Sequence, residues 1–219
     1  MTTELLWRVA APAAGMALGA LSGAVAHRLP LAPNDVSRPG PGRVALMALT
    51  GLALGGWAGL SLDGPLAVVG AAFAAALLLI AVIDAEHLWL PNLLTLPLGA
   101  AGLATSLFFG PGSFVDHVIG AILGFAVLAG LAAAYKRLRG RDGLGGGDAR
   151  LLAAIGAWVG WAGLPTVLVW GSAAGLSWVL ARIVVRRAPS LDTAMPYGTY
   201  LAIGAWLTWL YGPLGRAGW

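Results

Sequence analysis

Long apolar stretches dominate the chain, and short polar or Pro/Gly-rich segments separate them. A helix needs about 20 residues to cross the hydrocarbon core of a bilayer, so each stretch is a candidate membrane helix. Division at the interruptions predicts eight helices. They cover residues 5–26, 44–61, 66–83, 93–109, 115–135, 149–163, 166–185 and 195–211.

The stretch 151–181 is ambiguous because it carries no charged residue over 31 positions. That length is long for one membrane helix and short for two. The turn-forming sequence Gly163-Leu164-Pro165 favours two short helices with a break between them.

The basic residues indicate which side of the membrane each loop occupies. Two of them, Arg8 and Arg216, lie near the termini, and eleven lie in loops on the other side of the predicted bundle. Because cytoplasmic loops are enriched in Lys and Arg, the larger set is predicted to be cytoplasmic and both termini periplasmic. A single helix across 151–181 would split this set, so eight spans are favoured. The set comprises Arg28, Arg38, Arg43, Lys136, Arg137, Arg139, Arg141, Arg150, Arg182, Arg186 and Arg187.

Composition supports an all-α, polytopic membrane bundle that forms a single domain over residues 1–219. The chain is 59% apolar and only 10% charged, whereas soluble domains carry about a quarter charged residues. Its net charge of +4 comes from clusters without interleaved aromatic residues, so no nucleic acid partner is expected. The chain has no cysteine, and His27, His87 and His117 are widely spaced. We therefore expect interfacial histidines, no metal site and no cofactor.

Asp84 is the first of two acidic residues whose positions differ from those of ordinary solvated loop residues. It follows the uninterrupted apolar run 66–83, and the segment 84–92 contains Asp84 and Glu86 but no Lys or Arg. Repulsion and partial desolvation make such a pair of acids costly to ionise. The segment either marks a helix end with polar residues or holds a functional acid.

Asp148 is the second exception, because it follows three consecutive glycines, Gly145, Gly146 and Gly147. Asp is a favourable N-cap residue, so a flexible loop with a cap is one interpretation. A cap does not require three glycines, however. Glycines also let the backbone adopt positive φ and let another chain pass closely, as an extended substrate would.

The two acids are more informative together. Both are predicted at cytoplasmic helix ends and so at the same membrane depth, where they can meet. Two carboxylates sharing a site do not both ionise readily, so one keeps a proton while the other acts as a base. That is the chemistry of water attack on a peptide bond. The dipole of the following helix favours ionised Asp148, which makes Asp148 the expected base and Asp84 the expected acid.

Two other functions remain open at this point. A proton-coupled transporter also uses intramembrane acids, here Asp84 and Asp148. Transporter sites usually lie near the bilayer midplane between repeated halves, and no repeat is visible in this chain. A scaffold for a pilus or secretion machine would explain the bundle but not the paired acids.

Four blocks in order along the chain resemble the type IV prepilin leader peptidases, the bacterial GxGD aspartic membrane proteases. Gly145–Asp148 fits the GxGD signature, and its continuation contains Arg150. Ile83-Asp84 resembles the first-aspartate motif, in which a second acid commonly stands where Glu86 does. Residues 90–92 complete the first-aspartate motif. The remaining two blocks are residues 19–30 and 195–202.

The resemblance implies an eight-span aspartic endopeptidase of the bacterial inner membrane, with its site facing the cytoplasm. Catalysis would fall to Asp84 and Asp148, and the supporting residues would be Glu86, Gly145, Gly146, Gly147 and Arg150. The substrates would be type IV prepilins or type II secretion pseudopilins, cleaved after a short basic leader, within membrane lipid. The oligomeric state stays open.

One departure from the family concerns the first cytoplasmic loop, residues 29–43. Many members carry an insert there with two CxxC pairs that bind zinc, and this insert is associated with N-methylation of the cleaved pilin. Here residues 31–42 contain no cysteine, and a tetrahedral thiolate site cannot be built from them. The sequence therefore predicts a short form with doubtful methyltransferase activity.

Overall fold

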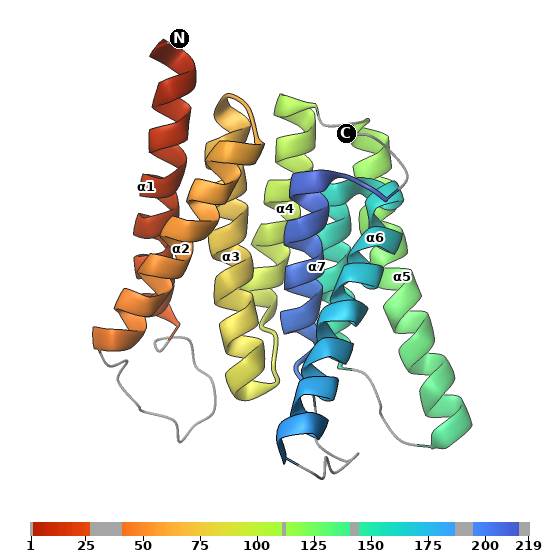
Figure 1. The fold of residues 1–219 in the computed structure, drawn as a ribbon. Helices are drawn as coiled ribbons and strands as arrows, with labels where there is room; N and C mark the ends of the chain where they lie inside the picture. Colours follow the sequence, from red (N-terminus) through yellow and green to blue (C-terminus); the bar gives the residue numbers. More distant parts are fainter. Residues whose placement is uncertain (1, 27–40, 111–112, 141–144, 187–194, 215–219) are drawn as a thin grey trace. The chain divides into compact units, whose positions relative to one another are not determined.

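The computed structural model describes residues 2–26, 41–110, 113–140, 145–186 and 195–214, and it contains seven helices in this part of the chain (Figure 1). The predicted all-α class is confirmed. The helices are α1 (Thr2–Val25), α2 (Pro41–Ser61), α3 (Pro65–His87), α4 (Asn92–Phe109), α5 (Phe114–Arg139), α6 (Gly146–Arg186) and α7 (Tyr197–Tyr211).

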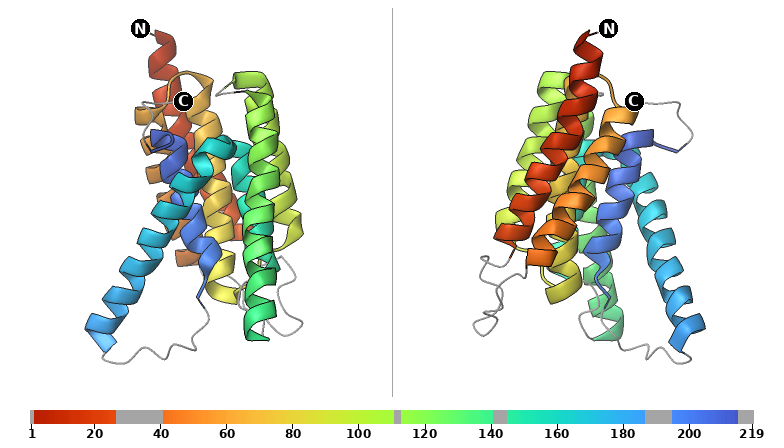
Figure 2. Two further views of the ribbon diagram at one scale, coloured as in Figure 1. Left: turned by 90° about the vertical axis from the view of Figure 1, so that its right-hand side faces the viewer. Right: turned by 60° about the vertical axis from the view of Figure 1, so that its left-hand side comes forward.

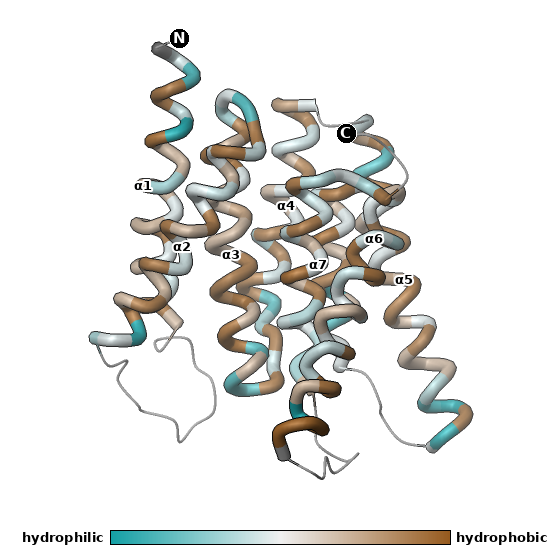
Figure 3. Tube along the Cα trace, viewed as in Figure 1, coloured by the Kyte–Doolittle hydropathy of each residue, from teal (hydrophilic) through white to brown (hydrophobic). Residues whose placement is uncertain are grey.

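Six of these helices are long and apolar enough to cross a membrane, so the chain is a multi-pass membrane protein. The remaining helix, α7, has 15 residues. Hydrophilic positions gather near helix ends, as the hydropathy colouring shows (Figure 3). The eight-span topology and the periplasmic termini remain predictions. So does the short loop 29–43, because residues 27–40 lie outside the described part of the chain.

The third helix is longer than predicted, because α3 continues through His87 and does not end at residue 83. Polar side chains in the last turn do not interrupt its hydrogen bonding. The helix ends where Leu88 adopts a left-handed conformation, with φ of 52°. The Leu88 N–H still donates to the Asp84 carbonyl at 2.9 Å, which closes the last turn. Asp84 therefore lies inside the final turn of α3.

The chain divides into two compact units, residues 1–83 and residues 84–219. In the N-terminal unit, α1 packs against α2 through glycines. A side chain at Gly15 or Gly19 would collide with the backbone of α2, at Gly51 and Met47 respectively. Glycines at four-residue spacing thus let the two helices pack closely. Ala11 of α1 also packs with Ala67 and Ala71 of α3 in a small buried cluster.

The C-terminal unit contains the last turn of α3 and helices α4 to α7. Gly120 of α5 meets Gly156 of α6 backbone to backbone, and Gly204 of α7 meets the backbone of Val167 in α6. Trp158 of α6 donates from Nε1 to the Leu98 carbonyl of α4 at 2.8 Å. These contacts make α6 the central helix of the unit.

Helix α6 is bent at Gly160, where φ is 63° and ψ is 176°. The two segments on either side of the bend, residues 146–159 and 161–186, diverge clearly (Figure 2). The prediction of two helical segments is thus close, but the predicted break at residues 163–165 is wrong. Gly160 adopts the left-handed region that favours glycine, whereas Pro165 lies within the second segment.

His117 corrects the expectation of interfacial histidines, because its side chain is only 2% exposed. Its Nδ1 donates to the Ala157 carbonyl at 2.9 Å. Ala157 lies just before the bend, where carbonyls lose their partners within the helix. The buried imidazole therefore joins α5 to the end of the first segment of α6.

Candidate active site

A cavity of about 510 Å³ within the C-terminal unit contains both predicted catalytic acids. It also contains four of the five predicted supporting residues. Its lining residues are Asp84, Leu88, Trp89, Leu90, Gly145, Gly146, Gly147, Asp148, Arg150, Met195 and Tyr197. The end of α3 and the start of α6, which are distant in sequence, therefore contribute to one cavity, as the paired-acid hypothesis requires.

Asp84 is buried, at 4% exposure, and is held by the first turn of α7. Its Oδ2 accepts a hydrogen bond from the backbone N–H of Thr199 at 2.8 Å and from the Thr199 hydroxyl at 3.4 Å. The Gly198 N–H also donates to this carboxylate. N–H groups in a first turn have no partner within their own helix. They form a natural binding site for an anion, so these hydrogen bonds offset part of the cost of burying the Asp84 carboxylate.

Gly198 is the residue that lets α7 approach so closely. A Cβ atom at this position would lie 2.9 Å from the Asp84 Oδ2 and 2.9 Å from the Leu90 Cδ1. Any larger residue would displace the carboxylate or the helix. Sequence analysis did not include Gly198 or Thr199 among the site residues, because a donor on the backbone leaves no charge or polarity signal in the sequence.

Asp148 is the third residue of α6, so it lies inside the first turn and is not the N-cap. The Gly145 N–H donates to its carboxylate. A Cβ atom at Gly145 would lie 3.4 Å from the Asp148 Oδ2, so the loop backbone passes close to the acid.

Leu90 separates the two acid-bearing elements. Its side chain is 3% exposed. A Cβ atom added at Gly147 would lie 2.9 Å from the Leu90 Cβ, and one added at Gly198 would lie 2.9 Å from the Leu90 Cδ1. Leu90 therefore packs against Gly147, which precedes Asp148, and against Gly198, in the first turn of the helix that binds Asp84. Sequence analysis used Leu90 only as part of a motif and did not predict this role.

Arg150 provides a positive charge in the cavity. Its Nε atom is buried, and within the described part of the chain it has no hydrogen-bond partner. A guanidinium with a donor still available can bind a carbonyl oxygen or an anion that enters the cavity.

Glu86, the remaining predicted supporting residue, does not line the cavity among the described residues. It lies two residues after Asp84 on α3, with its side chain 40% exposed and an oxygen 3.7 Å from the His87 Nε2. Its role in the site remains a prediction.

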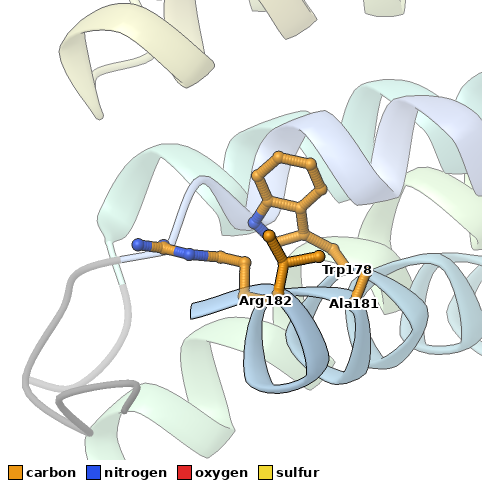
Figure 4. A pocket seen from close by; sticks show the side chains of 4 residues that line it. Trp178, Ala181 and Arg182 are labelled. Atoms are coloured by element: carbon orange, nitrogen blue, oxygen red, sulfur yellow. The ribbon is translucent and has the colours of Figure 1, made fainter. Parts of the chain in front are cut away.

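A second cavity, of about 440 Å³, lies along the second segment of α6 (Figure 4). It is lined by Trp178, Ala181, Arg182 and Val185, and none of these residues lines the cavity that holds the aspartates. None of these four lining residues carries a carboxylate, so this described lining lacks the paired acids of the first cavity.

Comparison with known proteins identifies the family. The model of the type IV leader peptidase family matches residues 71–180, a region that includes both Asp84 and Asp148. The chain belongs to the type IV leader peptidase family. No solved structure matches it. Family membership favours a peptidase over a transporter or a scaffold.

Several curated relatives in the family carry the name prepilin leader peptidase/N-methyltransferase. The protein from Aeromonas hydrophila is 44% identical over 130 residues, which is 59% of this chain and 44% of that protein. The protein from Burkholderia pseudomallei is 41% identical over 155 residues, covering 70% of this chain and 50% of that one. The protein from Pseudomonas aeruginosa is 38% identical over 136 residues, covering 62% and 47%. The chain thus spans about half the length of the curated relatives it matches.

Proposed function

We propose that this chain is an aspartic endopeptidase that removes the basic leader peptide of type IV prepilins or type II secretion pseudopilins. The observation that carries the proposal is that Asp84 and Asp148 line one cavity in a chain of this family. Cleavage takes place at the cytoplasmic face of the bacterial inner membrane. There the leader of a membrane-inserted substrate meets the dyad.

In the proposed mechanism Asp84 is the base and Asp148 is the acid, the reverse of the assignment expected from sequence. Asp84 accepts hydrogen bonds from two N–H groups and a hydroxyl, whereas a single N–H is identified as donating to Asp148. Hydrogen bonds to the charged form favour that form. Asp84 therefore holds the negative charge, and Asp148 keeps the shared proton.

The chemistry then follows from these two states. Asp84 takes a proton from the attacking water, whose oxygen bonds to the scissile carbonyl carbon, while Asp148 gives its proton to the carbonyl oxygen. When the resulting gem-diol collapses, one of its hydroxyls returns a proton to Asp148, the C–N bond breaks and the leaving nitrogen takes the proton held by Asp84, which restores the dyad. Arg150 binds the carbonyl oxygen as negative charge develops on it.

The glycines Gly145–Gly147 leave room for the substrate backbone to lie extended beside Asp148. The acids Asp84 and Glu86 attract the basic leader, and at physiological salt this attraction acts over about 8 Å. The partners are thus prepilins or pseudopilins within the lipid bilayer.

The chain cleaves without N-methylating its product. It contains no cysteine, so the zinc-binding thiolate site associated with methylation in related proteins cannot form within it. The relatives' shared name does not decide this point, because this chain spans only about half of their length.

Co-expression with a panel of prepilins and pseudopilins, followed by mass spectrometry of the products, tests this proposal. The expected product lacks the leader and has an unmodified amino terminus. Substrates left at full length would contradict the peptidase assignment. A methylated terminus, in cells with no other leader peptidase, would contradict the absence of methylation.

A further inference from the structure

The Thr95 hydroxyl in α4 is buried away from solvent. Its side chain is 2% exposed, and within the described part of the chain no group forms a hydrogen bond with its Oγ1. The carbonyl four residues earlier, at Pro91, already accepts from the N–H groups of Leu94 and Thr95, at 3.1 and 3.3 Å. Three other threonines donate to the carbonyl at that position of their own helices: Thr50, Thr105 and Thr208. A buried hydroxyl without a hydrogen bond is costly, so a partner outside α4 is expected.

The packing of α4 on α6 shows which residues Thr95 faces. A Cβ atom added at Gly99 of α4 would lie 3.4 Å from the Ala154 Cα of α6. Just before α4, Leu90 packs against Gly147 near the start of α6, so the two helices run in the same direction. Thr95 lies four residues before Gly99 and therefore on the same face of α4. It faces the second turn of α6, between Gly147 and Ala154.

Arg150 carries a second buried polar atom, in that same turn of α6. It lies four residues before Ala154 and so on the face that packs against α4. Its Nε is buried, and among the described residues neither this atom nor the Thr95 Oγ1 has a hydrogen-bond partner. Nε–H only donates, whereas a hydroxyl both donates and accepts. A single water between the two helices would satisfy both atoms, because buried waters typically bind two to four such groups.

We propose that Thr95 is a positioning residue that holds the Arg150 guanidinium through one buried water between α4 and α6. This inference rests on the proposed function, in which Arg150 binds the carbonyl oxygen of the scissile bond. The guanidinium is a rigid plane, so fixing Nε on the α4 side also fixes its two terminal nitrogens for the cavity that Arg150 lines. Thr95 is not among the described lining residues of this cavity, so it acts on the substrate only through the arginine.

Prepilin cleavage kinetics of a Thr95→Val variant test this inference, because valine keeps the shape of the side chain but lacks the hydroxyl. We expect kcat to fall roughly tenfold while KM changes less than about twofold, since a misplaced guanidinium loses a contact that strengthens only in the transition state. Thr95→Ser, which retains a hydroxyl, should restore kcat. Thr105→Val is the matched control: it removes a buried hydroxyl of the same helix that is bonded to the Ala101 carbonyl, and it should leave kcat unchanged.

Arg150→Lys shows whether Thr95 acts through the arginine, because lysine keeps the positive charge but has no Nε–H held in a rigid plane. In the Arg150→Lys background, Thr95→Val should lower kcat no further, since the two residues act as one unit. A second tenfold loss in the double variant, or an unchanged kcat in Thr95→Val alone, would overturn the positioning role while the peptidase assignment stands. If the unaltered enzyme and Thr105→Val cleave no prepilin, the proposed function fails, and this inference fails with it.

Discussion

In the proposed mechanism, the contact between Thr199 and Asp84 decides which acid starts as the base. The Thr199 hydroxyl and backbone N–H both donate to the same carboxylate oxygen. Removing a donor makes the carboxylate easier to protonate. If Asp84 is the base, a variant that lacks a donor should therefore lose activity at a higher pH than the unaltered enzyme does as the pH falls.

We therefore expect Thr199→Val to move the acidic limb of the pH–rate profile to higher pH, by at most about half a pH unit. The expected shift is small because the hydroxyl contact is long, at 3.4 Å. The alkaline limb should stay in place. Thr199→Ser, which retains a hydroxyl, should behave like the unaltered enzyme. The other ionisable groups of the cavity, Asp148, Arg150 and Tyr197, are present in both variants. If the alkaline limb shifts and the acidic limb does not, Asp84 acts as the acid, which would contradict the proposed assignment.

The two acids could be predicted from the sequence, but the residues that hold them in place could not. Asp84 and Asp148 were noticeable because charge at the end of an apolar run needs an explanation. Gly198 and Leu90 act through the absence or presence of bulk. Such a role depends on what lies opposite in the fold, and a single sequence does not contain that information.

At the scale of elements, the bend in α6 depends on Gly160. The backbone there has a φ of 63°, and the nearest atom to a Cβ would be the Asp116 carbonyl oxygen at 3.7 Å. Space is therefore available for a methyl group, and only the conformation resists it. The helix has other glycines nearby, and sequence analysis placed the break at Gly163-Leu164-Pro165 because a proline follows there.

Gly160→Ala should destabilise the folded protein by about 1–3 kcal/mol, because a residue with a Cβ is strained at positive φ with ψ near 180°. Thermal unfolding in detergent measures this. Gly130→Ala in α5 is the control, because a Cβ there has no atom within 4 Å and alanine favours helix. A midpoint for Gly160→Ala as high as that of Gly130→Ala would show that the bend does not need glycine.

At the scale of the whole molecule, the helices could be predicted closely from the apolar runs, because a membrane protein must be helical wherever its backbone meets lipid. Their ends differ from the predicted ends by a few residues, as in α3, where the helix includes Asp84. The packing partners of each helix were not predictable, since small residues such as Gly120 and Gly156 indicate a close contact but not which helix lies opposite.

The convergence of Asp84 and Asp148 could be predicted, unlike the other long-range contacts, because the predicted topology places both acids at the same membrane depth. The cavity confirms that the two acids meet. The peptidase proposal depends on this one long-range contact.

The most direct measurement of that dependence is cleavage of a co-expressed prepilin by Asp84→Asn and Asp148→Asn variants. Asparagine keeps the shape of the side chain but removes its ability to exchange a proton. Both variants should insert and fold, as judged by membrane yield and thermal midpoint, and leave the prepilin at full length, whereas the unaltered enzyme trims it. Trimming by either variant at a rate near that of the unaltered enzyme would contradict the account.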